Sequence, residues 1–329
     1  MNKSLFKIAL LYLILLIVLA LGSLFLGSVS FDFRTIFSAL LGEKNAANSI
    51  IFELRLPRVL LAIAVGGGLS VAGTVLQSIL KNPLAEPYIL GISSGGIFGT
   101  LLAMLLGLPF FISQIFSFSG SLLVIAIIFF IVLKFKSGFN SVTLLLSGVM
   151  IGAFFGALIL IILTLMRENL QTALFWLVGT LSFADASQSY YAFVFAVLLS
   201  IIISLFGYRL NLIAIGDEKN EAIGINLKNV RITLLILTGI LTGGLVAVSG
   251  IIGFIGMIIP HIVRNKYGYD NRVVLPISFL VGAIVLLISD TVARIVILPA
   301  ELPVGAITAF FGAPVFIWFL KKKDYYFTS

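Results

Sequence analysis

Charged side chains inside long apolar runs are the residues of this chain that could do chemistry. Asp290 and Arg294 lie four residues apart in such a run, and Glu301 follows close to Pro303. Carboxylates at membrane depth commonly couple transport to ions or protons. The four-residue spacing, however, places Asp290 and Arg294 on one face of a helix, where each neutralises the other. The spacing therefore predicts an ion pair, with Glu301 at the edge of a segment, and disfavours a proton relay.

Two further arginines, in the string Arg55-Leu-Pro-Arg58, begin another apolar run. One interpretation is that their stems are buried while the guanidinium groups reach water at the membrane surface. The other is a basic patch for an acidic partner, because Arg pairs with carboxylates in a fixed, forked geometry. Residue chemistry alone leaves both interpretations open for Arg55, Arg58 and Arg294.

Several kinds of chemistry are excluded by what the sequence lacks. It has no Cys, so it forms no disulfide, cysteine–zinc site or iron–sulfur cluster. Its one His, His261, lies next to Pro260 and is interpreted as a hydrogen-bonded structural residue. No Walker-type Gly-rich Lys motif is present, so any ATPase must be a separate chain. A membrane enzyme is therefore disfavoured, and we expect neither a metal nor a cofactor on this chain.

Composition decides the environment of these residues. Hydrophobic residues make up 60% of the 329 residues and charged residues only 10%, whereas soluble proteins carry about 25% charged residues. The length alone would suggest about two soluble domains. The chain has too few polar groups to cover such domains, so we expect one polytopic transmembrane domain, all α, over residues 1–329.

Apolar runs of about 20 residues indicate transmembrane helices, and about ten are predicted here. The first run follows Lys3 and Lys7 and is longer than a signal-peptide core, so we expect it to be retained. The predicted spans are 8–26, 59–80, 88–106, 111–133, 141–166, 190–208, a helix from about 231 to the glycines at 250–256, a short helix ending near Pro260, 273–291 and 303–320. A short segment around Trp176 precedes the sixth span.

Ten spans place both termini on one side of the membrane. With the N-terminus inside, 15 of the 21 Lys and Arg residues lie in inner loops. Because basic loops stay cytoplasmic, we expect both termini in the cytoplasm and a multi-pass protein of the cytoplasmic membrane. This topology explains the net charge of +8 without a nucleic-acid partner; the surroundings are membrane lipid.

A faint internal repeat suggests a transporter. The glycine-rich strings 67–73 and 243–250 each end ten residues before a proline, at Pro83 and Pro260. In the predicted topology the two copies run in opposite directions, as in transporters built from inverted repeats. Chance similarity between Gly, Val and Ala strings is the alternative, and both remain open.

The polar inner segment 216–226 has the pattern of a short helix. Asp217 and Glu218 suit its N-terminus, where the helix dipole favours negative charge. Gly224 suits its C-terminus. From this pattern the segment is either a solvated loop or a docking helix.

Taken in order, these strings resemble the membrane-spanning permease subunits of type II ABC importers, the family that takes up iron–siderophores, haem and vitamin B12. The resemblance covers nearly the whole chain. The matching strings are 55–58 (RLPR), 68–77 (GLSVAGTVLQ), 81–87 (KNPLAEP), 90–96 (LGISSGG), 253–264 (GFIGMIIPHIVR), 290–294 (DTVAR), 301–305 (ELPVG) and 312–316 (GAPVF).

The resemblance implies a type II permease fold and three kinds of partner. These are a second copy of the chain with the path on the dimer axis, two cytoplasmic ATPase subunits that bind ATP and Mg²⁺, and an extracytoplasmic binding protein. It implies docking of the binding protein at Arg55, Arg58 and Arg294. It implies coupling to the ATPase through Asp217, Glu218, Glu221, Ala222, Gly224 and Ile225. It implies a cytoplasmic gate at Asn82, Leu84, Ser141 and Val142, in a bend and a turn; Val142 departs from the two hydroxyl residues that one such permease has there.

The function expected from the sequence is import of a metal chelate, without covalent chemistry on this chain. Iron–siderophore is the first candidate, followed by haem and cobalamin, and no residue distinguishes them. The alternative is a secondary transporter coupled to an ion. It would need intramembrane carboxylates without a cationic partner, which the spacing of Asp290 and Arg294 argues against.

Overall fold

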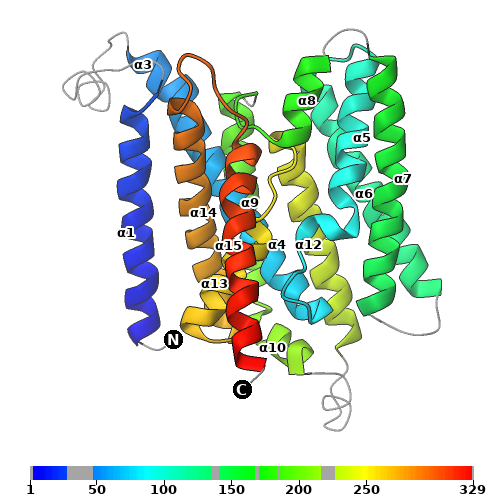
Figure 1. The fold of residues 1–329 in the computed structure, drawn as a ribbon, viewed down its shortest axis with the longest axis vertical. Coiled ribbons are helices and arrows are strands. Elements are labelled where there is room, and N and C mark those ends of the chain that lie inside the picture. Colours follow the sequence, from blue (N-terminus) through cyan, green and yellow to red (C-terminus); the bar gives the residue numbers. More distant parts are fainter. Residues whose placement is uncertain are drawn as a thin grey trace.

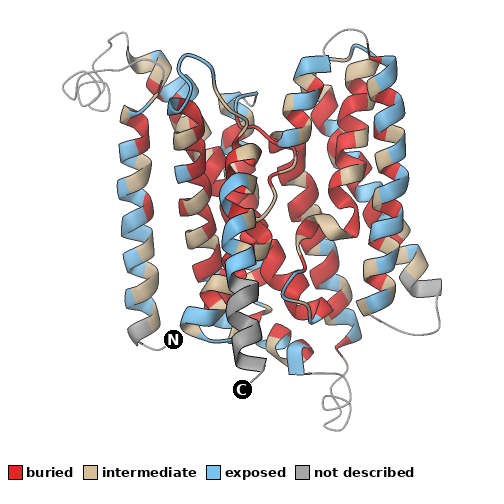
Figure 2. Cartoon of the chain, viewed as in Figure 1, coloured by how far each residue is buried: buried red, intermediate tan, exposed pale blue. Residues whose placement is uncertain are grey.

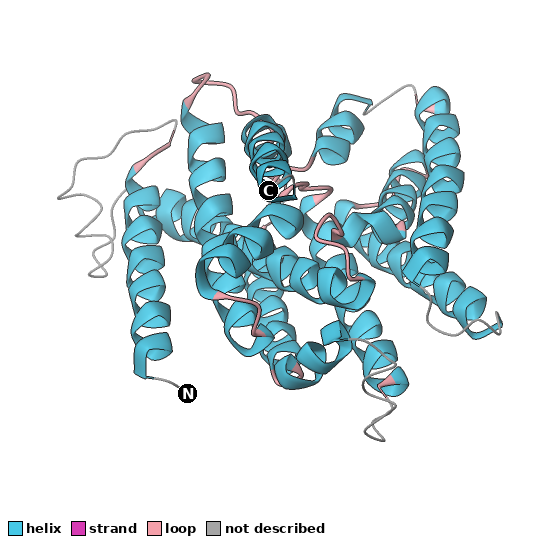
Figure 3. Ribbon diagram, turned by 60° about the horizontal axis from the view of Figure 1, so that its bottom comes forward, coloured by secondary structure: helices cyan, strands magenta, loops and turns pink. Residues whose placement is uncertain are grey.

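The computed structural model describes residues 3–27, 47–134, 141–166, 170–183, 185–215 and 227–327. Within these ranges the regular structure is helical, as Figure 3 shows. The helices are α1 (Lys3–Phe25), α3 (Ala47–Ser49), the π-helix η1 (Ile50–Arg55), α4 (Leu56–Leu80), the 3₁₀ helix η2 (Pro87–Leu90), α5 (Ile92–Leu105), α6 (Phe110–Lys134), α7 (Ser141–Leu165), α8 (Leu170–Val178), α9 (Ala186–Ser204), α10 (Gly207–Ile215), α12 (Lys228–Ser249), α13 (Ile255–Tyr267), α14 (Asn271–Ile295) and α15 (Val304–Phe327).

Some of these helices are long enough and apolar enough to span a membrane. In the described part of the chain, seven helical stretches are long and apolar enough to cross a bilayer. They are Leu5–Phe25, Ile50–Leu80, Phe110–Ile131, Ser141–Leu165, Ala186–Ser204, Lys228–Ser249 and Asn271–Ile295. The stretches Ile92–Leu105 and Val304–Trp318 are apolar but shorter. The all-helical membrane fold is confirmed, whereas the number of ten spans stays a prediction.

The long helices form a bundle of tilted rods, with α15 in front of its neighbours in the view of Figure 1. In this view α1 begins and α15 ends at the lower end of the bundle, where α10 also lies. The beginning of α4 and the end of α14 lie at the opposite end. This arrangement agrees with two termini on one side; which side is cytoplasmic rests on the distribution of Lys and Arg.

The centre of the bundle is α4. Buried positions follow it almost from end to end, whereas α1 and α7 expose apolar side chains along one side (Figure 2). Helices α9, α12, α13 and α14 all pack against α4. The exposed apolar sides need no polar cover in lipid. What holds such helices together is close packing and hydrogen bonding rather than exclusion from water.

Two interruptions of the helices meet inside the bundle. After α4 the chain turns through residues 81–86 into η2, and after α12 it passes through 250–254 into α13. The hydroxyl of Tyr88 donates to the carbonyl of Ile252 and accepts from its N–H, both at 3.0 Å. Irregular backbone at membrane depth needs such internal partners. Residues 67–73 and 243–250, the copies of the expected repeat, thus precede two breaks that touch.

The eighth predicted helix needs a correction. We expected a short helix that ends near Pro260, but α13 begins at Ile255 and runs to Tyr267 with Pro260 inside it. Proline is tolerated within membrane helices because neighbouring groups satisfy the freed carbonyl. Gly268, with φ of +86°, ends the helix. The segment around Trp176 is helix α8, and Trp176 is fully buried.

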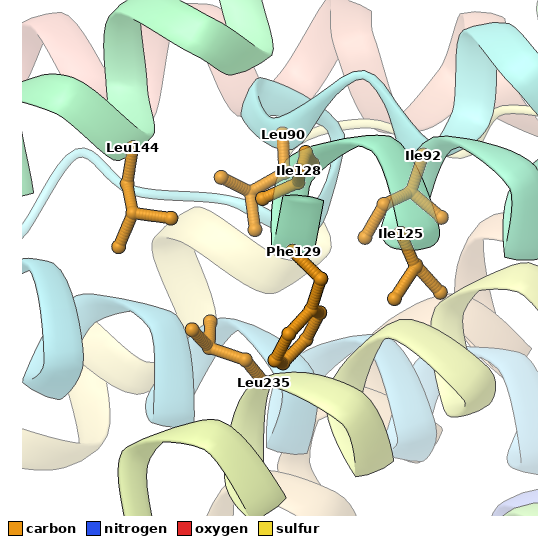
Figure 4. A pocket seen from close by; sticks show the side chains of 7 residues that line it. All are labelled: Leu90, Ile92, Ile125, Ile128, Phe129, Leu144 and Leu235. Carbon is orange, nitrogen blue, oxygen red and sulfur yellow. The ribbon is translucent and has the colours of Figure 1, made fainter. Parts of the chain in front are cut away.

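A small cavity of about 20 Å³ lies between η2, α5, α6, α7 and α12 (Figure 4). All its lining side chains are apolar: Leu90, Ile92, Ile125, Ile128, Phe129, Leu144 and Leu235. A water molecule needs two to four polar partners, and this lining offers none. The cavity is therefore a packing gap between helices and not a ligand site.

Candidate functional site

Arg58 is placed by the way α4 begins. The π-helix η1 runs directly into α4, Pro57 lies in the first turn of α4, and Arg58 follows it. Pro57 has no N–H to donate to the preceding turn, and the change from π to α winding lies directly before it. Arg58 thereby points from the start of α4 toward the end of α14, whose residues lie more than 200 positions later in the chain.

Arg58 binds two carboxylates. Its Nε donates to Asp290 Oδ1 at 2.9 Å and Oδ2 at 3.2 Å, and its Nη2 lies 2.9 Å from Oδ1. Its Nη1 donates to Glu301 Oε2 at 2.7 Å. The Arg58 side chain is 13% exposed and the Asp290 side chain 0%. This is a forked, charge-assisted interaction, the strongest geometry available to these groups.

Arg294 is the second cation on Asp290. Its Nε lies 3.2 Å from Asp290 Oδ2, which confirms the predicted pair. Its Nη2 also donates to Ser23 Oγ at 2.6 Å, and its Nη1 donates to the carbonyl of Leu26 at 3.3 Å. Only 4% of the Arg294 side chain is exposed. Arg294 therefore joins the ends of α14 and α1.

Arg55 completes the group. It is buried, and its Nη1 donates to the carbonyl of Leu24 at 2.5 Å. The last carbonyls of a helix lack partners within the helix, and Arg side chains commonly satisfy them. Arg55 and Arg294 together do so at the C-terminus of α1. We call Arg55, Arg58, Arg294, Asp290 and Glu301 the charge cluster.

The charge cluster borders a cavity of about 660 Å³. Its lining includes the start of α4 and the end of α14, which lie at the end of the bundle opposite the chain termini (Figure 1), the outer end in the predicted topology. Its lining residues are Gly27, Ile50, Glu53, Leu54, Arg55, Arg58, Leu181, Ser182, Asp185, Ala186, Arg294 and Glu301. The three predicted docking arginines are thus brought together, but bound to protein groups. Arg294 lines this cavity although only 4% of its side chain is exposed, and the docking role of the three arginines stays a prediction.

Of the two carboxylates that bind Arg58, Glu301 is the more accessible, with 34% of its side chain exposed. It also accepts from Ser182 Oγ at 3.0 Å. Burial by itself would raise the pKa of Glu301, but the charge of Arg58 and the hydrogen bonds from Arg58 and Ser182 more than offset this and leave its pKa lowered. Glu301 is therefore ionised at neutral pH, and its contact with Arg58 is lost only when the pH falls below the ordinary range of a glutamate.

The sequence identified Asp290, Arg294 and Glu301 but missed that Arg58 binds both carboxylates. Asp290 and Glu301 lie 232 and 243 positions from Arg58. The available signal was chemical. Two arginines and two carboxylates are predicted at the same depth. Their burial costs less free energy when they are paired, because an isolated charge is least stable in an apolar medium.

The predicted gate residues occupy two places. Lys81 ends α4 in a left-handed conformation, with φ of 50°. The bend at Asn82–Leu84 is confirmed: Asn82 Oδ1 accepts from the N–H of Leu84 at 2.9 Å. Ser141 and Val142 are the first residues of α7 and not a turn. Serine favours helix starts, and no helix-breaking residue follows it here. Leu84 and Val142 are exposed.

The predicted coupling residues Asp217, Glu218, Glu221, Ala222, Gly224 and Ile225 lie outside the described residues. Helix α10 ends before this segment at Ile215, and α12 begins after it at Lys228. Both flanking ends lie at the same end of the bundle as the chain termini (Figure 1).

A polar group near the Asn82 bend was also missed. Arg264 donates to Gln77 Oε1 at 2.5 Å and to Ser78 Oγ at 2.9 Å, and thus ties α13 to α4. His261 lies 3.2 Å from Asn265 Nδ2, in keeping with its predicted structural role. Within the described ranges no group of three or more His, Cys, Asp or Glu could hold a metal ion.

The amino-acid sequence is similar to a known protein family and to import permeases over nearly the whole chain. Residues 14–322 match the model of the FecCD transport family. The haemin transport system permease HmuU of Yersinia pestis is 40% identical, with 94% of each chain covered. The Fe(3+)-citrate import system permease YfmE of Bacillus subtilis is 34% identical, with 94% of this chain and 92% of its own covered. The vitamin B12 import system permease BtuC of Salmonella newport is 39% identical, with 83% and 84% covered.

A solved structure shows the same fold. It is an ABC transporter of the metal-chelate type in an inward-facing conformation, with a TM-score of 0.87 and 32% sequence identity. The match covers 96% of this chain and 99% of that one. The order of the helices, the matching residues 14–322 and the similarity to three import permeases lead to one conclusion: the chain belongs to the FecCD transport family.

Proposed function

We propose that this chain is the permease subunit of an ABC importer for a metal chelate. The observation that carries the proposal is the FecCD match over residues 14–322. An iron–siderophore is the first candidate substrate, and haem and cobalamin follow. The similarity to haemin, iron-citrate and vitamin B12 permeases supports the class of chelate without selecting a member.

The proposed assembly has two copies of the chain, two ATPase subunits and an extracytoplasmic binding protein. ATP and Mg²⁺ bind the ATPase, and this chain contributes no covalent step. Ten spans with cytoplasmic termini place the charge cluster outside and segment 216–226 inside the cytoplasmic membrane. In this topology Arg55, Arg58 and Arg294 face the binding protein.

The arrangement of the charge cluster gives no support to an ion-coupled secondary transporter. Such a mechanism needs a carboxylate that can gain and lose its charge during transport. Asp290 is fully buried, and its carboxylate contacts both Arg58 and Arg294. Glu301 is held by Arg58 at 2.7 Å. Neither carboxylate is available as a carrier of protons.

Transport by a reconstituted complex tests the function. The permease, its ATPase and its binding protein are placed in liposomes, and uptake of a ferric siderophore, haem and cobalamin is compared with and without ATP. Replacing Glu221–Gly224 by a Gly/Ser linker of equal length is expected to reduce ATP-driven uptake at least tenfold, because the proposed coupling helix no longer forms.

The matched control is the same replacement in a different connection, at residues 106–109 between α5 and α6, which should leave binding of the ATPase intact. ATP-dependent uptake of one chelate supports the proposed function, and uptake driven by a proton gradient without ATP overturns it. Normal uptake and normal ATPase binding by the 221–224 variant would show that this segment is an ordinary solvated loop.

The gate is a second proposal, because apolar residues can close a path by excluding water. Since the chain has no Cys, a Val142→Cys variant introduces a unique thiol at an exposed position. We expect a disulfide between the two copies in the closed state and at least a threefold lower yield when ATP opens the path. Met150→Cys, also exposed and two turns further along α7, is the control. Absence of the Val142→Cys cross-link in every nucleotide state would place this residue away from the dimer axis.

A further inference from the structure

The two carboxylates on Arg58 differ in how easily another group could replace them. Asp290 makes three contacts with Arg58, a fourth with Arg294, and is 0% exposed. Glu301 makes one contact with Arg58, at 2.7 Å, and 34% of its side chain is exposed. Asp290 is therefore a permanent partner of Arg58, whereas the Glu301 contact faces the cavity and can be exchanged.

Glu301 also lies in the connection between two helices, α14 and α15. It belongs to residues 296–303, which connect α14 to α15. Val296, Ile297 and Leu298 in this connection are exposed. Glu301 binds Arg58 on α4 and Ser182 in the connection between α8 and α9. One side chain thus joins the start of α15 to two other parts of the bundle.

The other carboxylates on the cavity are differently engaged. Asp185 accepts from the N–H of Gln188 at 2.8 Å and from Ser187 Oγ at 2.8 Å, and so caps α9. Glu53 is exposed on η1. Among the described residues that line the cavity, Glu301 is the acid that forms an ion pair with an arginine. A carboxylate arriving from outside would meet Glu301 at the accessible side of Arg58.

We propose that Glu301 is an internal substitute for a carboxylate of the docking protein, and that docking exchanges the two on Arg58. The partner is an acidic protein surface. Asp290 stays bound during the exchange, while release of Glu301 loosens residues 296–301. The start of α15 stays in place, because the N–H of Leu302 donates to the carbonyl of Ala293 and the N–H of Gly305 to that of Gly179, both at 3.1 Å. This inference rests on the proposed function, because it assigns a regulatory contact to the proposed docking site.

The exchange is energetically plausible because it keeps every buried charge paired. Removing one partner of a buried ion pair is costly since the remaining charge is left without compensation. Replacing Glu301 by another carboxylate leaves Arg58 with the same number of hydrogen-bonded acids. Glu301, once released, is already one-third exposed and can be hydrated. The affinity for a partner is then set by competition with Glu301.

Peptide binding to the purified full-length chain tests this exchange. The probe is a fluorescent tetraglutamate peptide, with tetraglutamine as the uncharged control peptide. Glu301→Gln is expected to bind tetraglutamate about tenfold more tightly than the wild type, because the competitor is neutral. Glu53→Gln is the matched control variant: it removes the same charge from the same cavity without removing the contact to Arg58, and we expect less than a twofold change.

A spin label reports the mobility of residues 296–301, the part of the connection that Glu301 holds. Because the chain has no Cys, Ile297→Cys takes a single nitroxide at a position that is 52% exposed. We expect tetraglutamate to increase the mobility of this label in the otherwise wild-type chain, and Glu301→Gln to increase it without peptide.

The outcomes separate the two proposals. Salt-sensitive binding of tetraglutamate that is equal in Glu301→Gln and Glu53→Gln, with no change in label mobility, overturns the exchange and leaves the docking site standing. Equal, weak binding of both peptides to the wild type and to all variants overturns the docking site and the exchange together.

Discussion

Replacing Asp290 by Asn is expected to destabilise the folded chain by about 3–5 kcal/mol, the range found when one partner of a buried ion pair is removed. Asp290 is the shared counter-charge of Arg58 and Arg294. The Asp290 side chain is 0% exposed and that of Arg294 only 4%, so water cannot replace it. Arg58 would keep Glu301, but Arg294 would lose its carboxylate.

Thermal unfolding of the purified protein in detergent measures this effect. Glu301→Gln is the matched control, because it removes the other carboxylate from Arg58 at a position that is 34% exposed. We expect a loss of about 1 kcal/mol or less for this variant, since exposed ion pairs contribute little. Equal losses in Asp290→Asn and Glu301→Gln would contradict the distinction between a permanent and an exchangeable partner.

A double variant identifies the cause. If the loss in Asp290→Asn comes from the uncompensated charge of Arg294, then changing Arg294 to Gln in the same chain should recover part of the stability. Residues in direct contact show such non-additive behaviour, and the interaction energy is the departure from the sum of the single changes. Purely additive losses would show that Asp290 acts through packing and not through charge.

The sequence predicted the parts of the fold that depend on local patterns. Runs of apolar residues placed α6 and α7 within a residue of their observed ends, 110–134 and 141–165. Pro260 misled the prediction, because a rule learned from soluble helices treats proline as a stop, whereas packing inside the bundle supports α13 on both sides of it. The touching of the two breaks at Tyr88 and Ile252 depends on tertiary packing that no local pattern records.

In the candidate site, too, one contact was predictable from local spacing and the others depend on tertiary packing. The Asp290–Arg294 pair was predictable because four residues make one helical turn. The contacts of Arg58 with Asp290 and Glu301 join the start of α4 to the end of α14 and to residues 296–303. Their geometry follows from how the whole bundle packs. Sequence chemistry could say only that buried charges need partners.

Replacing Gly282 by Val is expected to damage the helix packing severely. Helices α4 and α14 cross with Gly66 and Gly282 at their contact. A Cβ on Gly282 would overlap Ser70 Oγ and the carbonyl of Gly66, and a Cβ on Gly66 would overlap the carbonyl of Gly282. Ser70 cannot easily turn away, because its Oγ donates to the Gly66 carbonyl at 2.8 Å. The close approach of these two backbones therefore requires glycine.

In lipid the consequence is large, because helices associate through close packing and the surrounding acyl chains compete as equally apolar partners. Extra side-chain atoms in a packed interior typically cost about 1–3 kcal/mol and occasionally more, and Val at Gly282 must move the backbone of the central helix. We expect a loss of about 3 kcal/mol or more, seen as a lower unfolding temperature and a smaller monodisperse fraction in size-exclusion chromatography. Gly22→Val is the matched control, since a Cβ on Gly22 of α1 would meet no atom within 4 Å. Similar behaviour of the two variants would mean that α4 and α14 can separate without cost, and that the tight crossing does not hold the charge cluster in place.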